Sequence, residues 1–156
     1  MKILSKSQVD ELLNISSKNK KHNLIIRTFL ETGLKVSELI TLQVQNFNQD
    51  KFQINSRTIK ISKELSNSLI SLILHKPLNS LLFESHKQTR KYTPSSIIHM
   101  INKYSMNCDT IRKKIGTYTL RNTYVSNQFT DNNRDDIADS LGIQSKSLLR
   151  SCNFLF

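Results

Sequence analysis

Apolar residues recur at helical spacing through the N-terminal part of the chain. Segment 7–14 carries them on one face, and segment 23–32 is apolar on nearly every side. A helix that is apolar all round is usually central and buried. Gly33 follows at the position where a helix end favours a left-handed residue. The pattern therefore predicts a first helix, a buried second helix that ends at Gly33, and a short third helix over 36–43.

The hydrophobic period changes in the middle of the chain. Apolar and polar residues alternate over 51–62, on either side of residues 55–57, which is typical of a β-hairpin. The helical period returns over 63–75. It stops before Pro77, because proline cannot continue a helix.

The segment after this helix predicts a strand, a loop and another helix. Residues 81–83 are apolar and predict a short strand, whereas the polar stretch 85–92 predicts a loop. A hydroxyl at the N-cap and a proline at the first helical position favour a helix start. Thr93 and Pro94 supply this pair, so we expect a helix to begin there.

Three further helices are expected near 118–129, 134–141 and 146–150. The chain has 156 residues, which fits one domain. A domain of about 150 residues can bury roughly 70% of its unfolded surface, which is enough for a stable core without disulfides or bound metals. The sequence therefore predicts one mainly α domain with a small β-hairpin, an α+β fold, over residues 1–156.

The charge balance indicates a polyanionic partner. Lysine and arginine number 23 against 12 acidic residues, which gives a formal net charge of +11. Such an excess attracts polyanions before any specific contact forms. Because the basic residues recur along the whole chain, nucleic acid is the partner that the charge favours. The alternative is a surface that is basic only for solubility.

The cysteine and histidine patterns do not indicate a disulfide framework or a metal motif. The two cysteines, Cys108 and Cys152, form no CxxC pair, and the four histidines are scattered. The N-terminus lacks the apolar region of a signal peptide, and no apolar run approaches the roughly 18 residues of a membrane span. We expect no metal, no cofactor and no membrane partner. We expect a cytoplasmic location, nucleoid-associated or in an equivalent reducing compartment.

The segment 28–39, Thr-Phe-Leu-Glu-Thr-Gly-Leu-Lys-Val-Ser-Glu-Leu, is similar to the signature that opens the active site in tyrosine recombinases, the phage integrase family. The order of elements and motifs resembles the catalytic domain of that family from residue 4 to 152. The resemblance implies a catalytic domain alone, without the upstream core-binding domain that many members have. It also implies DNA as the partner, recombination or integration as the process, and no metal or nucleotide cofactor.

Residue by residue, the resemblance places five positions in the active site. Lys35 stands where the family has an arginine that clamps the scissile phosphate, and Arg121 matches the second clamping arginine. Tyr118 replaces a histidine, Ile143 replaces the histidine of a Leu-Gly-His segment, and Cys152 stands at the nucleophilic tyrosine. Lysine keeps the charge of arginine but lacks its two-pronged fork. The resemblance therefore implies a degenerate active site.

The lysine that acts as general acid in the family's hairpin has no assigned counterpart in this chain. Lys51 and Arg57 are the nearest basic residues, and Arg57 aligns with another basic position just before the second strand. We take Lys35, Arg57, Arg121 and Lys91 as candidate DNA contacts. The alternatives are that Lys35 is merely solvated, that Arg121 pairs with a carboxylate such as Glu38, that Tyr118 and Tyr124 pack in the core, and that the basic group around Lys91 is plain surface.

Two functional hypotheses follow from these substitutions. The first is a DNA-binding descendant of a recombinase in which strand cleavage is absent or weak, acting as a remnant or as a regulator of an active relative. The second is an active minimal site-specific recombinase that uses an atypical nucleophile such as Cys152. In either case the protein partner on DNA would be a second copy of this chain or an active recombinase.

Overall fold

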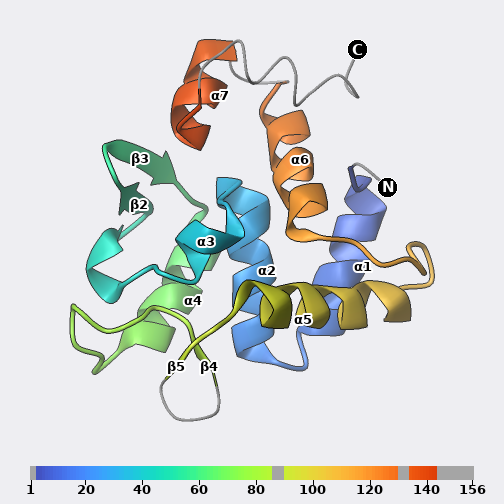
Figure 1. The fold of residues 1–156 in the computed structure, drawn as a ribbon, viewed down its shortest axis with the longest axis horizontal. Coiled ribbons are helices and arrows are strands. Elements are labelled where there is room, and N and C mark those ends of the chain that lie inside the picture. The colour runs from blue at the N-terminus through green and yellow to red at the C-terminus, as the bar shows by residue number, and fades with distance from the viewer. Residues whose placement is uncertain (1–2, 86–89, 130–133, 144–156) are drawn as a thin grey trace.

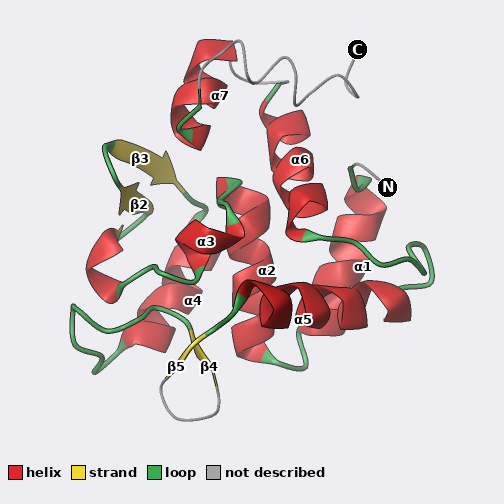
Figure 2. Ribbon diagram, viewed as in Figure 1, coloured by secondary structure: helices red, strands yellow, loops and turns green. Residues whose placement is uncertain are grey.

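The computed structural model describes residues 3–85, 90–129 and 134–143. Helices dominate this part of the chain (Figure 2). The elements are α1 (Lys6–Ser16), α2 (Lys20–Thr32), α3 (Val36–Leu39), the 3-10 helix η1 (Val44–Asn46), β1 (Phe47–Asn48), β2 (Lys51–Ile54), β3 (Arg57–Lys60), α4 (Lys63–Ile73), β4 (Glu84–Ser85), β5 (Arg90–Lys91), α5 (Pro94–Asn107), α6 (Thr117–Gln128) and α7 (Arg134–Leu141). The mainly α fold with small antiparallel sheets is confirmed.

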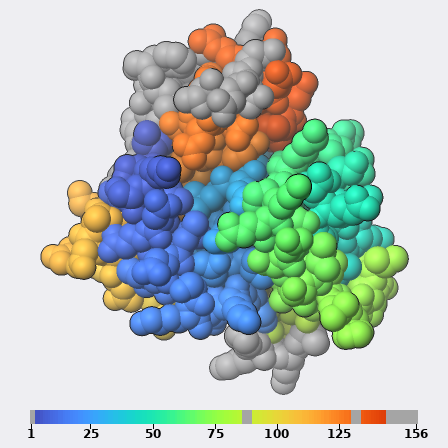
Figure 3. Space-filling view, turned by 180° about the vertical axis from the view of Figure 1, so that it is seen from behind, coloured from blue at the N-terminus to red at the C-terminus, as the bar shows by residue number. Residues whose placement is uncertain are grey.

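Helix α2 is the central element, as its apolar sequence predicts. Ile25, Ile26 and Phe29 are fully buried, and the helix contacts α1, α4 and α6. It begins at Asn19, whose side chain accepts a hydrogen bond from the backbone N–H of His22. It ends at Gly33, which has a φ of +61°. The other helices surround α2, with α6 and α7 at one end of the molecule (Figures 1 and 3).

The predicted hairpin over 51–62 is confirmed as β2 and β3. Phe52 pairs with Ile59 and Ile54 with Arg57, so that the turn at residues 55–56 places Arg57 at the start of β3. A third strand, β1, pairs antiparallel with β2 and was not predicted. Two-residue strands such as β1 are too short to display alternation in the sequence.

The expectations for residues 81–92 are wrong in part. Residues 81–83 form no named strand, and Leu81 makes only an isolated bridge to Gln43. The predicted loop instead contains parts of β4 and β5, which pair antiparallel through Glu84 opposite Lys91. These strands lie at the end of the molecule opposite α7 (Figure 1). The helix expected near 146–150 lies outside the described residues.

A second, smaller core joins α7 to α6. Tyr124 and Val125 of α6 pack against Ile137, Ala138 and Leu141 of α7, separately from the main core. Gly33 lies against this cluster, because a Cβ atom there would collide with the Tyr124 ring and would come within 2.9 Å of Leu141 Cδ2. The small core thus fixes α7 beside the end of α2.

The cysteine that the structure describes belongs to the protein interior. Cys108 is fully buried at the end of α5, where its thiol donates a hydrogen bond to the carbonyl of Tyr104. Burial, together with the nearby carboxylates of Glu11 and Asp109, raises the pKa of the thiol to about 11. Among the described residues, no three metal-ligating side chains gather at one point, and no helix has the length and apolar character that crossing a bilayer requires.

Candidate functional site

The turn between α2 and α3 presents Lys35 at the surface. Gly33 turns the chain out of α2, and Lys35 follows in an extended conformation as the N-cap of α3. The backbone N–H of Lys35 donates to Oε2 of Glu38 at 2.8 Å, which closes this first turn. The Lys35 side chain is exposed, and within the described part of the chain no carboxylate forms an ion pair with it.

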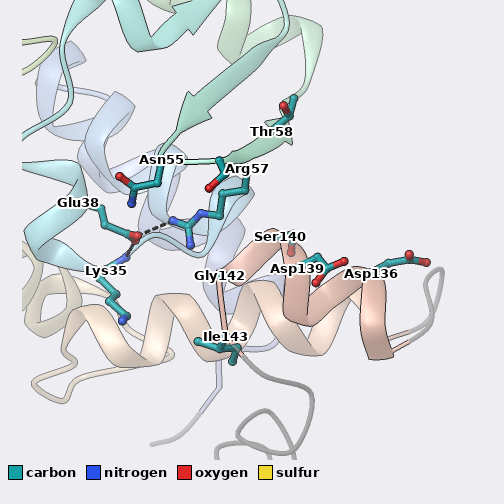
Figure 4. A pocket seen from close by; sticks show the side chains of 11 residues that line it. Lys35, Glu38, Asn55, Arg57, Thr58, Asp136, Asp139, Ser140, Gly142 and Ile143 are labelled. Carbon is teal, nitrogen blue, oxygen red and sulfur yellow. Dashed lines mark hydrogen bonds and ion pairs between the residues drawn. The ribbon is translucent and has the colours of Figure 1, made fainter.

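Glu38 also holds Arg57 in place. Its Oε1 lies 2.5 Å from Nη2 of Arg57, and the two side chains are only 16% and 13% exposed. The Nε of Arg57 is buried and has no hydrogen-bond partner in the described structure. One carboxylate therefore orders the loop that carries Lys35 and neutralises the arginine at the start of β3 (Figure 4).

Arg121 reaches the same place from α6. Its Nη1 donates a hydrogen bond to the carbonyl oxygen of Gly33, two residues before Lys35. Burial lowers the pKa of the Arg121 guanidinium, the Glu38 carboxylate raises it, and the Arg57 guanidinium lowers it. Arginine nevertheless remains charged in proteins. The guanidinium groups of Arg57 and Arg121 therefore both lie near the Glu38 carboxylate, which pairs with Arg57 and also accepts a hydrogen bond from the backbone N–H of Lys35.

An open pocket of about 1130 Å³ lies over this cluster, between α3, the β2–β3 turn and α7. Lys35 and Arg57 line one side of it, and residues of α7 line the other (Figure 4). The lining residues are Lys35, Glu38, Asn55, Ser56, Arg57, Thr58, Asp136, Asp139, Ser140, Gly142 and Ile143. The lining is therefore of mixed charge, with two basic and three acidic side chains.

The end of α7 packs directly on the arginine. Gly142 has a φ of +62°, and a Cβ atom at this position would collide with Nη1 of Arg57. The next residue, Ile143, lines the pocket with an apolar side chain that has no donor for a phosphate. Glycine at 142 thus permits the close approach of α7 to Arg57.

Comparison with known proteins identifies the fold. No protein-family model matches the chain. A tyrosine recombinase of Pseudothermotoga lettingae is 30% identical over 132 residues, which span 77% of this chain and 44% of that protein. Among solved structures, the XerA recombinase superposes with a TM-score of 0.85 at 22% identity, over 96% of this chain and 57% of that one. The catalytic domain of bacteriophage HP1 integrase gives a TM-score of 0.69 at 23% identity, over 99% and 88% of the two chains.

The chain has the catalytic-domain fold of the tyrosine recombinase and phage integrase family. The XerH site-specific recombinase, solved bound to its difH substrate in a pre-cleavage complex, superposes with a TM-score of 0.80 at 16% identity, over 97% of this chain and 49% of that one. The chain therefore spans about half the length of XerH and 44% of the Pseudothermotoga relative.

Two of the candidate residues, Tyr118 and Lys91, do not line the pocket, and a third lies outside the described residues. Tyr118 is 72% exposed, so the packing role considered for it is wrong, whereas Tyr124 is buried as expected. Lys91 lies on β5, outside the pocket and at the far end of the molecule (Figure 1), and its contact with DNA stays a prediction. Cys152 lies outside the described residues.

Sequence reasoning placed Ile143, just after α7, in the site by resemblance, but it missed the two carboxylates that α7 adds to the pocket. Asp136 and Asp139 line the pocket, and their spacing of three residues places both on one face of the helix. That spacing was visible in the sequence. Which face of α7 is turned to the pocket was not, because the packing of the helix decides it.

Proposed function

We propose that this chain binds the phosphate backbone of duplex DNA at the cluster formed by Lys35, Arg57 and Arg121, and that it cleaves DNA weakly or not at all. The observation that carries the proposal is that Glu38 lies beside the guanidinium groups of Arg57 and Arg121 and binds the backbone of Lys35, whose exposed side chain lines the same pocket as Arg57. The net charge of +11 supports a polyanionic ligand. The likeness to XerH in complex with its DNA substrate supports duplex DNA as that ligand.

The expectation of weak cleavage rests on the chemistry of the side chains present. Lys35 supplies a charge without the bidentate fork of arginine, and Ile143 supplies no donor. Preorganised donors of this kind are typically worth about 10²–10³ in rate each. Binding without cleavage would let the chain occupy a recombination site and exclude an active recombinase, which is the role of a regulator.

Replacing Lys35 by alanine is expected to weaken duplex binding by about three- to tenfold and to reduce the salt dependence by about one phosphate. Lys35 is the sharpest probe because its side chain is exposed, whereas Arg57 and Arg121 also hold the fold. The measurement is fluorescence anisotropy with a labelled duplex of about 30 base pairs over a salt series. Lys18→Ala, another exposed lysine outside the pocket, is the matched control. Equal affinities and salt slopes for the two variants would reject this site.

No covalent protein–DNA adduct is expected from the unmodified chain on nicked suicide substrates. The measurement is denaturing electrophoresis at high protein concentration. An adduct that disappears in Cys152→Ser or in Tyr118→Phe would instead establish an active recombinase with an atypical nucleophile. The Tyr118→Phe variant is included because Tyr118 is exposed and lies on the same helix as Arg121.

A further inference from the structure

Helix α7 places two carboxylates in the pocket that holds Lys35 and Arg57. Asp136 and Asp139 line it together with Ser140 from the same helix (Figure 4). Asp139 is exposed, and no ion pair involving it is found within the described residues. Within the described residues, its negative charge therefore lies at the pocket and is not neutralised by an ion pair.

The charges on the other side of the pocket do not neutralise the Asp139 carboxylate. Glu38 and Arg57 neutralise one another across 2.5 Å, and Lys35 is the other cation of the lining. A phosphate bound to Lys35 would therefore occupy the same pocket as the Asp139 carboxylate. Like charges in one site repel by amounts that solvent screens but does not remove.

The apolar contacts of α7 within the described residues lie outside the main core. The helix is attached through the small core around Tyr124 and Leu141 and through the contact of Gly142 with Arg57. Neither attachment is part of the main core around α2. A small cluster separate from the main core is the kind of region that opens at low free-energy cost. A shift of α7 would therefore leave the main core intact.

We propose that α7 is an electrostatic brake on the DNA site: the Asp139 carboxylate repels a phosphate that enters the pocket to reach Lys35, so that full binding requires α7 to shift or this charge to be removed. The inference rests on the proposed function and adds its regulation. It predicts that this chain binds DNA more weakly than its net charge implies. It also assigns to an acidic helix a role that the cationic cluster alone would not suggest.

Asp139→Asn is expected to tighten duplex binding by about two- to fivefold at 0.1 M salt. The gain should shrink as salt rises, because the Debye length falls from about 10 Å at 0.1 M to about 3 Å at 1 M. Asp10→Asn is the matched control, since Asp10 is an exposed aspartate of α1 outside the pocket and loses the same charge. Asp139→Glu keeps the charge and should bind like the unmodified chain.

The outcomes separate the brake from the proposed function. If Asp139→Asn binds duplex DNA more tightly than the unmodified chain and Asp10→Asn does not, the result supports the brake. Salt-dependent binding by the unmodified chain with equal gains in both variants overturns the brake and leaves the DNA-binding proposal standing. If no variant binds DNA at 0.1 M salt, both proposals fail. Circular dichroism melting of each variant establishes that affinities are compared between folded proteins, and Asp139→Ser, which also removes the charge, replaces Asp139→Asn if that variant does not fold.

Discussion

Replacing Gly33 by alanine is expected to destabilise the domain by about 3 kcal/mol. Part of the loss is local, because a side chain in the left-handed conformation costs about 1–2 kcal/mol and Gly33 has a φ of +61°. The rest is steric. The added Cβ atom would collide with the Tyr124 ring and crowd Leu141, and overpacking of this kind typically costs about 1–3 kcal/mol.

Thermal unfolding followed by circular dichroism measures this effect. For a chain of this size about 3 kcal/mol corresponds to a fall in Tm of about 6–12 °C. The matched control is Gly116→Ala. Gly116 has a φ of −104°, and an added Cβ atom would meet nothing closer than the backbone nitrogen of Tyr118 at 3.9 Å. If both variants lower the Tm equally, the close packing of α2, α6 and α7 around Gly33 is wrong.

Glu38→Gln is expected to lower the free energy of unfolding by about 2–4 kcal/mol at neutral pH. Glutamine keeps the size of the side chain and removes the charge. The guanidinium of Arg57, only 13% exposed, would then remain beside Arg121 without a carboxylate. Breaking a buried pair by removing one partner is strongly destabilising, because it leaves an uncompensated charge. The loss also loosens the turn that carries Lys35.

Urea denaturation of Glu38→Gln beside Glu64→Gln tests this expectation. Glu64 pairs with Arg27 at 2.7 Å, but its side chain is 73% exposed, so its loss is expected to cost no more than about 0.5 kcal/mol. The same mechanism predicts that the Glu38→Gln variant regains part of its free energy of unfolding in high salt, because salt screens the repulsion between Arg57 and Arg121. A Glu38→Gln variant as stable as Glu64→Gln would show that the carboxylate does not hold the cluster together.

The sequence predicted the elements of this fold because most of them carry local signals. The apolar face of α2 and the glycine at its end are visible within a dozen residues, and so are the hydroxyl and proline at the start of α5. The β4–β5 pair was missed because its strands have two residues each. Pairing between such short segments is decided by tertiary contacts and not by local propensity.

The resemblance to tyrosine recombinases predicted part of the candidate site. The resemblance selected Lys35, Arg57 and Arg121; the structure places Arg57 and Arg121 beside Glu38, whose carboxylate binds the backbone of Lys35, and the roles of the three residues stay a prediction. Charge alone placed Lys91 in the same set, and charge carries no information about position. The partner of Glu38 was not foreseen either, because Arg57 and Arg121 are both cations and only the fold shows that the carboxylate pairs with Arg57.

The buried thiol at the end of α5 makes chemical labelling of this protein simple. A thiol with a pKa near 11 and no exposed surface does not react with maleimides or iodoacetamide at neutral pH. Because the chain has only two cysteines, any fluorophore or spin label taken up by the native protein reports on position 152. The residue that stands at the nucleophile position by resemblance can therefore be followed spectroscopically without removing Cys108.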